Sequence, residues 1–149
     1  MKWSAVLLAC MMTLSLNADE SEQQLLGLDN LRWKYRVILV FARQPYLSNA
    51  LSNLEEFAAA IEERDITWFV LDDGSLHTNY DGTMSDKLHE QLMNSHFTPV
   101  PAETAVLLIG KDGTLKSRSS DMDLEATFGL IDQMPMRREE MRRKSDDPD

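Results

Sequence analysis

Cysteine is nearly absent from this chain of 149 residues, and its single copy, Cys10, lies close to the amino terminus. The residues around it have the features of a secretory signal peptide. Lys2 precedes an apolar run of twelve residues, 5–16, and Ala18 is followed by two acidic residues. We therefore expect residues 1–18 to be removed as a signal peptide, together with Cys10. A mature chain without a thiol has no disulfide-exchange or thiol peroxidase chemistry.

Long hydrophobic runs are also lacking. The run 5–16 is shorter than the roughly 20 residues that span a bilayer, and the later runs 37–42 and 106–109 have the length of strands. We therefore expect no membrane-spanning segment. An alternative interpretation of the leader is a bacterial lipobox, Leu7-Leu8-Ala9-Cys10, which would anchor a lipoprotein through Cys10. Against a lipobox, Cys10 is followed by two apolar methionines, where a lipoprotein usually has a polar tether. Both interpretations predict export, to the periplasm or out of the cell.

Basic residues are scarce relative to acidic ones. The chain has 15 Lys and Arg against 25 Asp and Glu, which gives a formal net charge of −10. Cleavage after Ala18 removes only the charge of Lys2, so the mature chain would carry −11. Such a surface repels phosphate backbones and anionic membranes. We expect no nucleic-acid binding, and we look for recognition sites in local clusters of basic residues.

The apolar and β-branched residues that are present concentrate in strand-length segments. Residues 37–42 are an unbroken apolar run, which indicates a strand buried on both faces, and residues 66–71 (ITWFVL) predict a second buried strand. Residues 104–109 predict a third buried strand. Lys111-Asp112-Gly113 is typical of a hairpin turn, and residues 114–118 alternate like an edge strand.

Helical spacing of apolar residues predicts three helices in the domain and a short fourth one. The first has Ser48 or Ser52 as its cap, and the second covers residues 84–95 with a capping box of Thr83 and Asp86. The third begins near Asp123. The core face of the first helix consists of Leu51, Leu54, Ala58 and Ile61, with Phe57 beside them.

Proline divides the carboxy-terminal region. Pro135 should end or kink the third helix at Met134, because proline disfavours helical geometry in the residue before it. The following MRREEMRRK, residues 136–144, predicts a short exposed helix with pairs Glu139–Arg143 and Glu140–Lys144.

The predicted order is β-α-β-α-β-β-α, with two parallel units joined by helical crossovers, then an antiparallel hairpin and a closing helix. This is the order of a thioredoxin-like α/β fold. We expect a polar lead-in over residues 19–30, a single thioredoxin-like domain over 31–142 and an acidic tail over 143–149. The redox cysteines of such a fold follow the first core strand, and Pro45 and Ser48 stand at those two positions. Pro99 or Pro101 is a candidate for the cis-proline that faces them.

Three stretches carry a family resemblance: LRWKYR at 31–36 leading into VILVFA, LIGKDG at 108–113, and IDQMPMRREEM at 131–141. Together they resemble the P-DUDES family, a domain of unknown function. Its relatives are short secreted bacterial proteins and modules of extracellular matrix proteins of the sushi-repeat and equarin type. The resemblance covers residues 25–142. It implies a thioredoxin-like, peroxiredoxin-related fold, an extracytoplasmic location, no established reaction and no thioredoxin-type cysteine pair.

The basic residues lie in two clusters, one before the first strand and one after Pro135. Arginine suits bidentate contacts with carboxylate or phosphate, and Trp33 offers an aromatic surface between two bases. The alternative that we favour for the bases is internal pairing with carboxylates, and for the tryptophan it is cover for the core edge. The candidate binding residues are Arg32, Trp33, Lys34, Arg36, Lys111, Arg137 and Arg138.

The leading functional hypothesis is an exported, non-catalytic binding module whose ligand is an unknown protein or a small anionic molecule. We assign it no catalytic residue, no cofactor and no metal. The alternative is an enzyme of unknown reaction, either a thiol-independent redox protein or a metal-assisted hydrolase. A hydrolase site would use the loop with Asp72, Asp73, His77 and Asp81, which matches no spaced metal motif.

Overall fold

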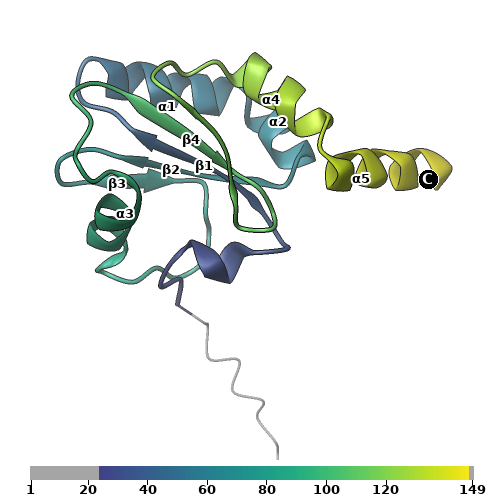
Figure 1. The fold of residues 1–149 in the computed structure, drawn as a ribbon, viewed down its shortest axis with the longest axis horizontal. Coiled ribbons are helices and arrows are strands. Elements are labelled where there is room, and N and C mark those ends of the chain that lie inside the picture. Colours follow the sequence, from purple (N-terminus) through teal and green to yellow (C-terminus); the bar gives the residue numbers. More distant parts are fainter. Residues whose placement is uncertain (1–23, 148–149) are drawn as a thin grey trace, which may run out of the picture.

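The computed structural model describes residues 24–147, so the predicted signal peptide and the lipobox at Cys10 lie outside the described residues. A five-stranded sheet forms the centre of the domain, with the order β3-β2-β1-β4-β5 (Figure 1). The predicted buried strands are confirmed with almost unchanged bounds. The strands are β1 (Arg36–Phe41), β2 (Ile66–Leu71), β3 (Leu76–Thr78), β4 (Ala105–Ile109) and β5 (Leu115–Ser119).

Helices cover both faces of the sheet, which explains why every residue of β1, β2 and β4 is buried and why all but Arg36 and Thr67 are apolar. Ile38 and Val40 of β1 pack against α1 (Tyr46–Glu56), α2 (Ala58–Glu63) and α4 (Leu124–Asp132). Val37, Leu39 and Phe41, which alternate with them, pack against α3 (Leu88–His96) and the short 3-10 helix η1 (Leu28–Leu31). The result is a three-layer α/β/α domain.

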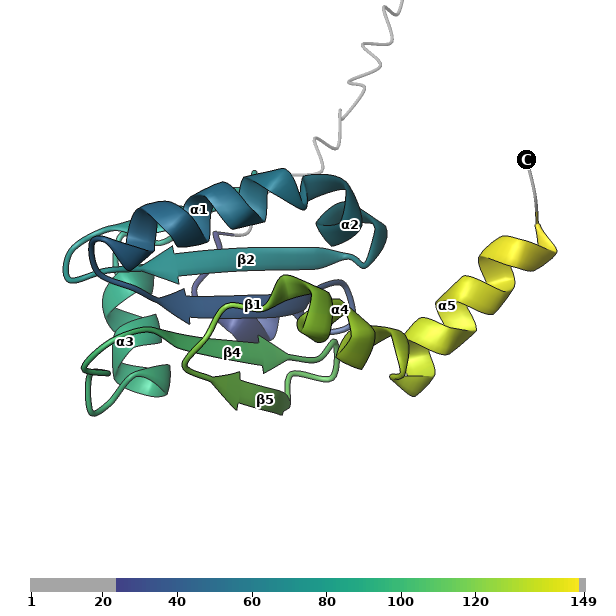
Figure 2. The same ribbon diagram turned by 90° about the horizontal axis from the view of Figure 1, so that it is seen from above.

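The direction of β4 differs from the prediction. β1 and β2 are parallel, but β4 is antiparallel to β1, so the sheet contains one parallel unit instead of two. The cause is the unpredicted strand β3, which turns back from β2, and helix α3, which lies crosswise to the strands (Figure 2). The chain therefore enters β4 at Ala105, opposite Phe41, the last residue of β1. This parallel pair followed by an antiparallel hairpin confirms the thioredoxin-like α/β fold.

Two helices differ from their predicted form. The first is interrupted at Phe57 and continues as α2, so Leu54 and Ile61 are buried but Ala58 is exposed. The second begins at Leu88, four residues later than predicted, with Lys87 as its N-cap residue, and Met84 forms an isolated bridge with Leu25. Leu25 is itself buried, so this residue of the predicted lead-in belongs to the core.

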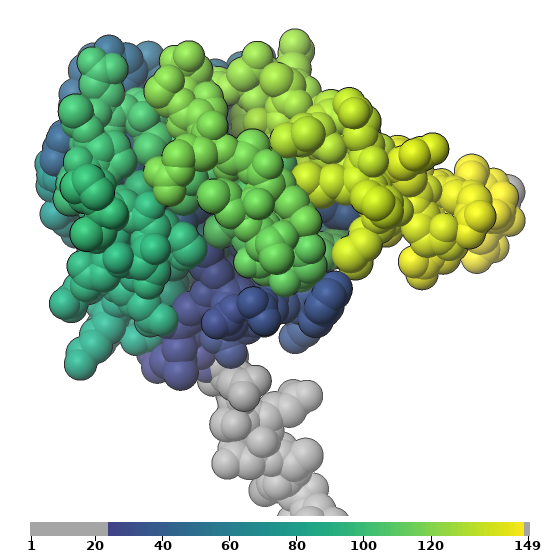
Figure 3. All heavy atoms as spheres, viewed as in Figure 1, coloured from purple at the N-terminus to yellow at the C-terminus, as the bar shows by residue number. Residues whose placement is uncertain are grey.

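The carboxy-terminal region divides at proline as predicted. Helix α4 ends at Asp132, and Pro135 begins α5 (Pro135–Asp146), where its missing N–H costs no hydrogen bond. The first turns of α5 contact the domain, whereas its second half extends away from the body (Figures 2 and 3). The helix continues into the predicted acidic tail. Among residues 24–147, no helix is both long and apolar enough to cross a membrane.

The first half of β2 lies at the edge of the sheet, because β3 pairs only with Phe69 to Leu71. A single side chain takes the place of a neighbouring strand there. The Asn79 amide accepts a hydrogen bond from the Trp68 N–H at 2.8 Å and donates one to the Ile66 carbonyl at 3.2 Å. Thr78 adds a bond from its hydroxyl to the Trp68 carbonyl at 2.6 Å. The edge backbone is therefore satisfied without a sixth strand.

Replacing this amide should weaken the fold. We expect Asn79→Ala to lower the free energy of unfolding by about 1–3 kcal/mol, because it leaves backbone groups of β2 without their partner. Asn79→Asp should cost less than Asn79→Ala, since it keeps the acceptor for Trp68. Urea denaturation of the two variants measures this. Asn94→Ala, at an exposed position of α3, is the control and should have no effect; equal stability of Asn79→Ala and Asn94→Ala would contradict the role given to Asn79.

Candidate functional site

The end of the sheet where a thioredoxin carries its cysteines has no thiol here. Helix α1 begins at Tyr46 without a side-chain cap, so Ser48 is not the cap that the sequence suggested. Its hydroxyl instead donates a hydrogen bond to the Gln44 side chain at 3.0 Å. The peptide bonds Gln44-Pro45 and Thr98-Pro99 are both cis. Of the two candidates for the cis-proline, Pro99 therefore has the predicted isomer.

An arginine–aspartate pair lies near this end of the sheet. Arg43 donates to both carboxylate oxygens of Asp73, at 2.7 and 2.8 Å, and its guanidinium lies 5.1 Å from the centre of the Phe41 ring. The hydrogen bonds from Arg43 lower the pKa of Asp73. Asp72, next to it, accepts backbone N–H bonds from Gly74 and Ser75 and so shapes the loop. Within the described part of the chain, no cluster of three His, Asp or Glu side chains could hold a metal ion.

The opposite end of the sheet brings the three motif stretches of the sequence together. Trp33 donates its backbone N–H to the carbonyl of Lys111 at 2.7 Å, which joins the first stretch to the hairpin between β4 and β5. Glu140 of α5 accepts hydrogen bonds from Arg36 at 3.2 Å and from Lys111 at 2.8 Å. Residues more than one hundred positions apart thus form one site. The motif stretches of the resemblance therefore correspond to a single spatial unit.

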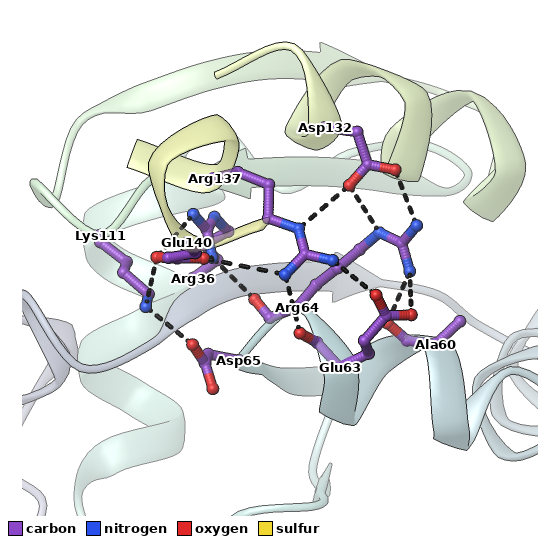
Figure 4. A network of polar contacts seen from close by, with 9 residues as sticks. All are labelled: Arg36, Ala60, Glu63, Arg64, Asp65, Lys111, Asp132, Arg137 and Glu140. Atoms are coloured by element: carbon purple, nitrogen blue, oxygen red, sulfur yellow. Dashed lines mark hydrogen bonds and ion pairs between the residues drawn. The ribbon is translucent and has the colours of Figure 1, made fainter. Parts of the chain in front are cut away.

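This unit is a network of charged side chains beneath α5 (Figure 4). Arg36 and Arg137 have side chains that are 1% and 5% exposed, and each finds carboxylate partners inside the domain. The four cations and four carboxylates cancel in formal charge, and no buried side-chain nitrogen or oxygen of the described residues lacks a hydrogen-bond partner. The members are Arg36, Arg64, Lys111, Arg137, Glu63, Asp65, Asp132 and Glu140.

Hydrogen bonding lowers the pKa of two carboxylates of this network, Glu140 and Asp132. Burial alone would raise the pKa of Glu140, but the hydrogen bonds from Lys111 and Arg36 outweigh it, and the pKa lies below its ordinary value. The pKa of Asp132 is lowered chiefly by the hydrogen bond from Arg64, with a further contribution from Arg137. Both acids are therefore charged wherever the network is intact.

The predicted binding residues divide into buried and exposed groups. Internal pairing accounts for Arg36, Lys111 and Arg137, the three that are buried. Arg32 is half exposed and pairs with Asp29 at 3.2 Å. Trp33, Lys34 and Arg138 are exposed, and neither of these two cations has an ion-pair partner among residues 24–147. Asp65, which the sequence analysis did not single out, and Glu140, which it paired with Lys144, complete the site, and only the spatial arrangement reveals these roles.

A cavity of about 260 Å³ lies beside the network. Arg36 and Lys111 line it from the sheet, and Met134 to Met136 line it from the junction of α4 and α5. Lys116 also lines it and forms an ion pair with Asp112 at 2.8 Å, which helps to lower the pKa of Asp112 to about 2. Met134 contacts the core, whereas Met136 is exposed.

The fold and the site define a class: a thioredoxin-like domain that has no cysteine among residues 24–147 and carries a neutral ion-pair network at one end of its sheet. The chain belongs to the family described as "Domain of unknown function (DUF4174)", whose model matches residues 27–140. A search of curated proteins gives no match.

Two solved structures of thioredoxin-related proteins are similar to this chain. The pneumococcal exposed lipoprotein thioredoxin of Streptococcus pneumoniae is 16% identical, with a TM-score of 0.46, over 72% of this chain and 90% of its own. Thioredoxin peroxidase I of Plasmodium yoelii is 13% identical, with a TM-score of 0.49, over 82% of this chain and 81% of its own.

Neighbouring arginines of α5 should behave differently when they are replaced. Arg137→Ala should lower the free energy of unfolding by about 2–3 kcal/mol, because it leaves Glu63 and Asp132 without their buried partner. Arg138→Ala removes the same charge from an exposed position and should change stability by less than about 0.5 kcal/mol. Chemical denaturation of the two variants measures the difference. Equal stabilities would show that the network does not hold α5 to the domain.

The network should also make stability depend on pH. A carboxyl group whose pKa is lower in the folded state stabilises the fold above its unfolded pKa, and this contribution is lost as the pH falls through the folded value. For Glu140 the loss begins below its ordinary value of 4.5. We expect Glu140→Gln to flatten the fall in unfolding free energy below about pH 4.5, and Glu125→Gln, at an exposed site on α4, to leave it unchanged. Parallel acid profiles for Glu140→Gln and the unmodified protein would contradict this account.

Proposed function

We propose that this protein is an exported binding module that keeps a thioredoxin-like scaffold but performs no thiol chemistry. Proline and serine at the redox positions and the absence of cysteine after Cys10 support the non-catalytic part. The signal-like leader, and the resemblance of the three motif stretches to the P-DUDES family of secreted and matrix proteins, support the exported part. Its partner is a protein or a small molecule that carries negative charge.

The observation that carries the proposal is the conformation of Trp33. This tryptophan is 66% exposed and has a φ angle of +65°, in the left-handed region that bulky residues rarely adopt. Its backbone is held there by the hydrogen bond to Lys111. A costly conformation that directs a large aromatic side chain into solvent adds nothing to packing. Such strain is typical of functional positions, and exposed tryptophans are frequent anchors of protein interfaces.

Charge around Trp33 favours an anionic partner. Lys34 follows it directly, and Arg138 lies on the first turns of α5 at the same end of the sheet. Neither forms an ion pair among the described residues, so both can reach a partner without breaking the network. Trp33 supplies apolar contact area, and the two cations supply charge complementarity.

Replacing Trp33 by glycine separates binding from stability. We expect Trp33→Gly to leave the free energy of unfolding unchanged or to raise it by up to about 1 kcal/mol, because glycine adopts the left-handed conformation without strain. The same variant should lose the partner that the unmodified protein captures from the exported fraction of its native cells. Capture followed by mass spectrometry, and denaturation of each variant, provide the two measurements.

Tyr46→Ala is the matched control, since Tyr46 is another exposed aromatic residue, 52% accessible, at the start of α1. It should retain the partner that Trp33→Gly loses. Retention by both variants, or loss by both, would refute the assignment of the surface. Reduction of insulin disulfides or consumption of a hydroperoxide by the purified mature protein at enzymatic rates would refute the non-catalytic part.

A further inference from the structure

A second cavity lies on a different part of the surface and has a different character. It has a volume of about 480 Å³ and lies between helices α1 and α2 and the unpaired edge of β2. Its walls are mainly apolar, with Leu54, Ile61 and Ile66 among them. Tyr35, Trp68 and Tyr80 add three aromatic rings. We call this cavity the edge groove.

The charged groups that line the edge groove are all acidic: Glu55, Glu62, Asp65 and Asp81. Asp65 holds Lys111 at 2.8 Å and belongs to the network. The other three carboxylates form no ion pair within residues 24–147. The groove therefore contrasts with the neutral network, because its negative charge is not compensated by the protein.

An apolar trough with aromatic rings and unpaired carboxylates matches one kind of group. The long aliphatic stems of lysine and arginine pack on apolar walls, while their charged heads stay at a polar rim. Aromatic faces attract the same cations. A carboxylate or phosphate ligand would be repelled by the rim, and the net charge of −10 increases the local concentration of cationic partners.

We propose that the edge groove binds the lysine or arginine side chains of an extended segment of a partner protein. The groove is bordered by exposed residues such as Glu55 and Ala58 and is open to solvent. An open site does not enclose a small molecule as ligand pockets usually do, whereas a protein segment gains further contacts beyond the rim. The backbone edge of β2 is already occupied by Asn79, so side chains, and not an added strand, carry the recognition. This proposal does not depend on the surface around Trp33.

The test is a nuclear magnetic resonance titration of the purified protein with a capped Gly-Lys-Gly-Lys-Gly peptide. We expect saturable shifts at the Trp68 indole and at the backbone amides of Thr67 and Asn79. The double variant Glu62→Gln/Asp81→Asn should raise the dissociation constant at least tenfold. A control pair, Glu90→Gln/Glu125→Gln, removes the same charge from exposed positions on α3 and α4 and should leave the constant within a factor of two.

Two comparisons make the outcome decisive. The matched peptide Gly-Glu-Gly-Glu-Gly should give no saturable shifts in the groove. Butylammonium, which carries the charge and stem without a peptide backbone, should bind at least tenfold more weakly than the lysine peptide. Equal weakening by both double variants would identify non-specific attraction to an acidic surface and overturn the proposal. Equal affinity for butylammonium would assign the groove to small amines and overturn the choice of a protein segment.

Discussion

Arg36 opens the central strand of the sheet with a permanent charge, yet its side chain is 1% exposed. A charge removed from water in this way destabilises the fold unless hydrogen-bonded partners of opposite sign surround it. Glu140 supplies two such contacts from α5, and the carbonyl of Arg64 supplies a third at 2.8 Å. This guanidinium therefore helps to fix the position of α5, together with the pairs that Arg137 and Lys111 form. Through Glu140 and Lys111, it also helps to fix the position of the β4–β5 hairpin.

The two ends of the sheet are stabilised by different kinds of contact. At the end where a thioredoxin performs chemistry, short polar contacts such as those of Ser48 and Asp72 organise loops. At the other end, buried charges join the amino-terminal segment, the hairpin and α5. In a thioredoxin, the most specific residues lie at the redox end of the sheet. In this chain they lie at the opposite end. The three motif stretches that meet there, 31–42, 108–113 and 131–141, contain no cysteine in this chain.

Hydrophobic patterning was sufficient to predict most of the fold. Runs of mainly apolar residues predict β1, β2 and β4, because a strand covered by helices on both faces buries nearly all of its side chains. Pro135 likewise marked the boundary between two helices. Strand β3 was missed because its three residues, Leu76–Thr78, are only half buried and contain a histidine. That omission also led to the wrong direction for β4.

The candidate site was less predictable, since charge pairing is a property of the folded chain. The sequence marked Arg36, Arg137 and Arg138 as alike, and internal pairing and recognition remained open for all three. Their burial depends on which side of α5 faces the domain, and the low amphipathicity of that helix does not indicate this. Glu140 was expected to pair with Lys144 within α5, but it points to Arg36 and Lys111 instead. The edge groove gave no sequence signal, because its acids come from separate elements.

The amide of Asn79 has a consequence for how copies of this protein behave at high concentration. A bare strand edge is a template on which other chains can add, and this is a common route to aggregation. Asn79 occupies the edge at Trp68 and Ile66 with a side chain that cannot propagate a ladder. At the far edge of the sheet, β5 carries Lys116 and Arg118, whose charges oppose edge-to-edge pairing. The two edges of the sheet thus resist polymerisation by different means. At β2 the backbone groups are already hydrogen-bonded, and at β5 the positive charges repel a second copy.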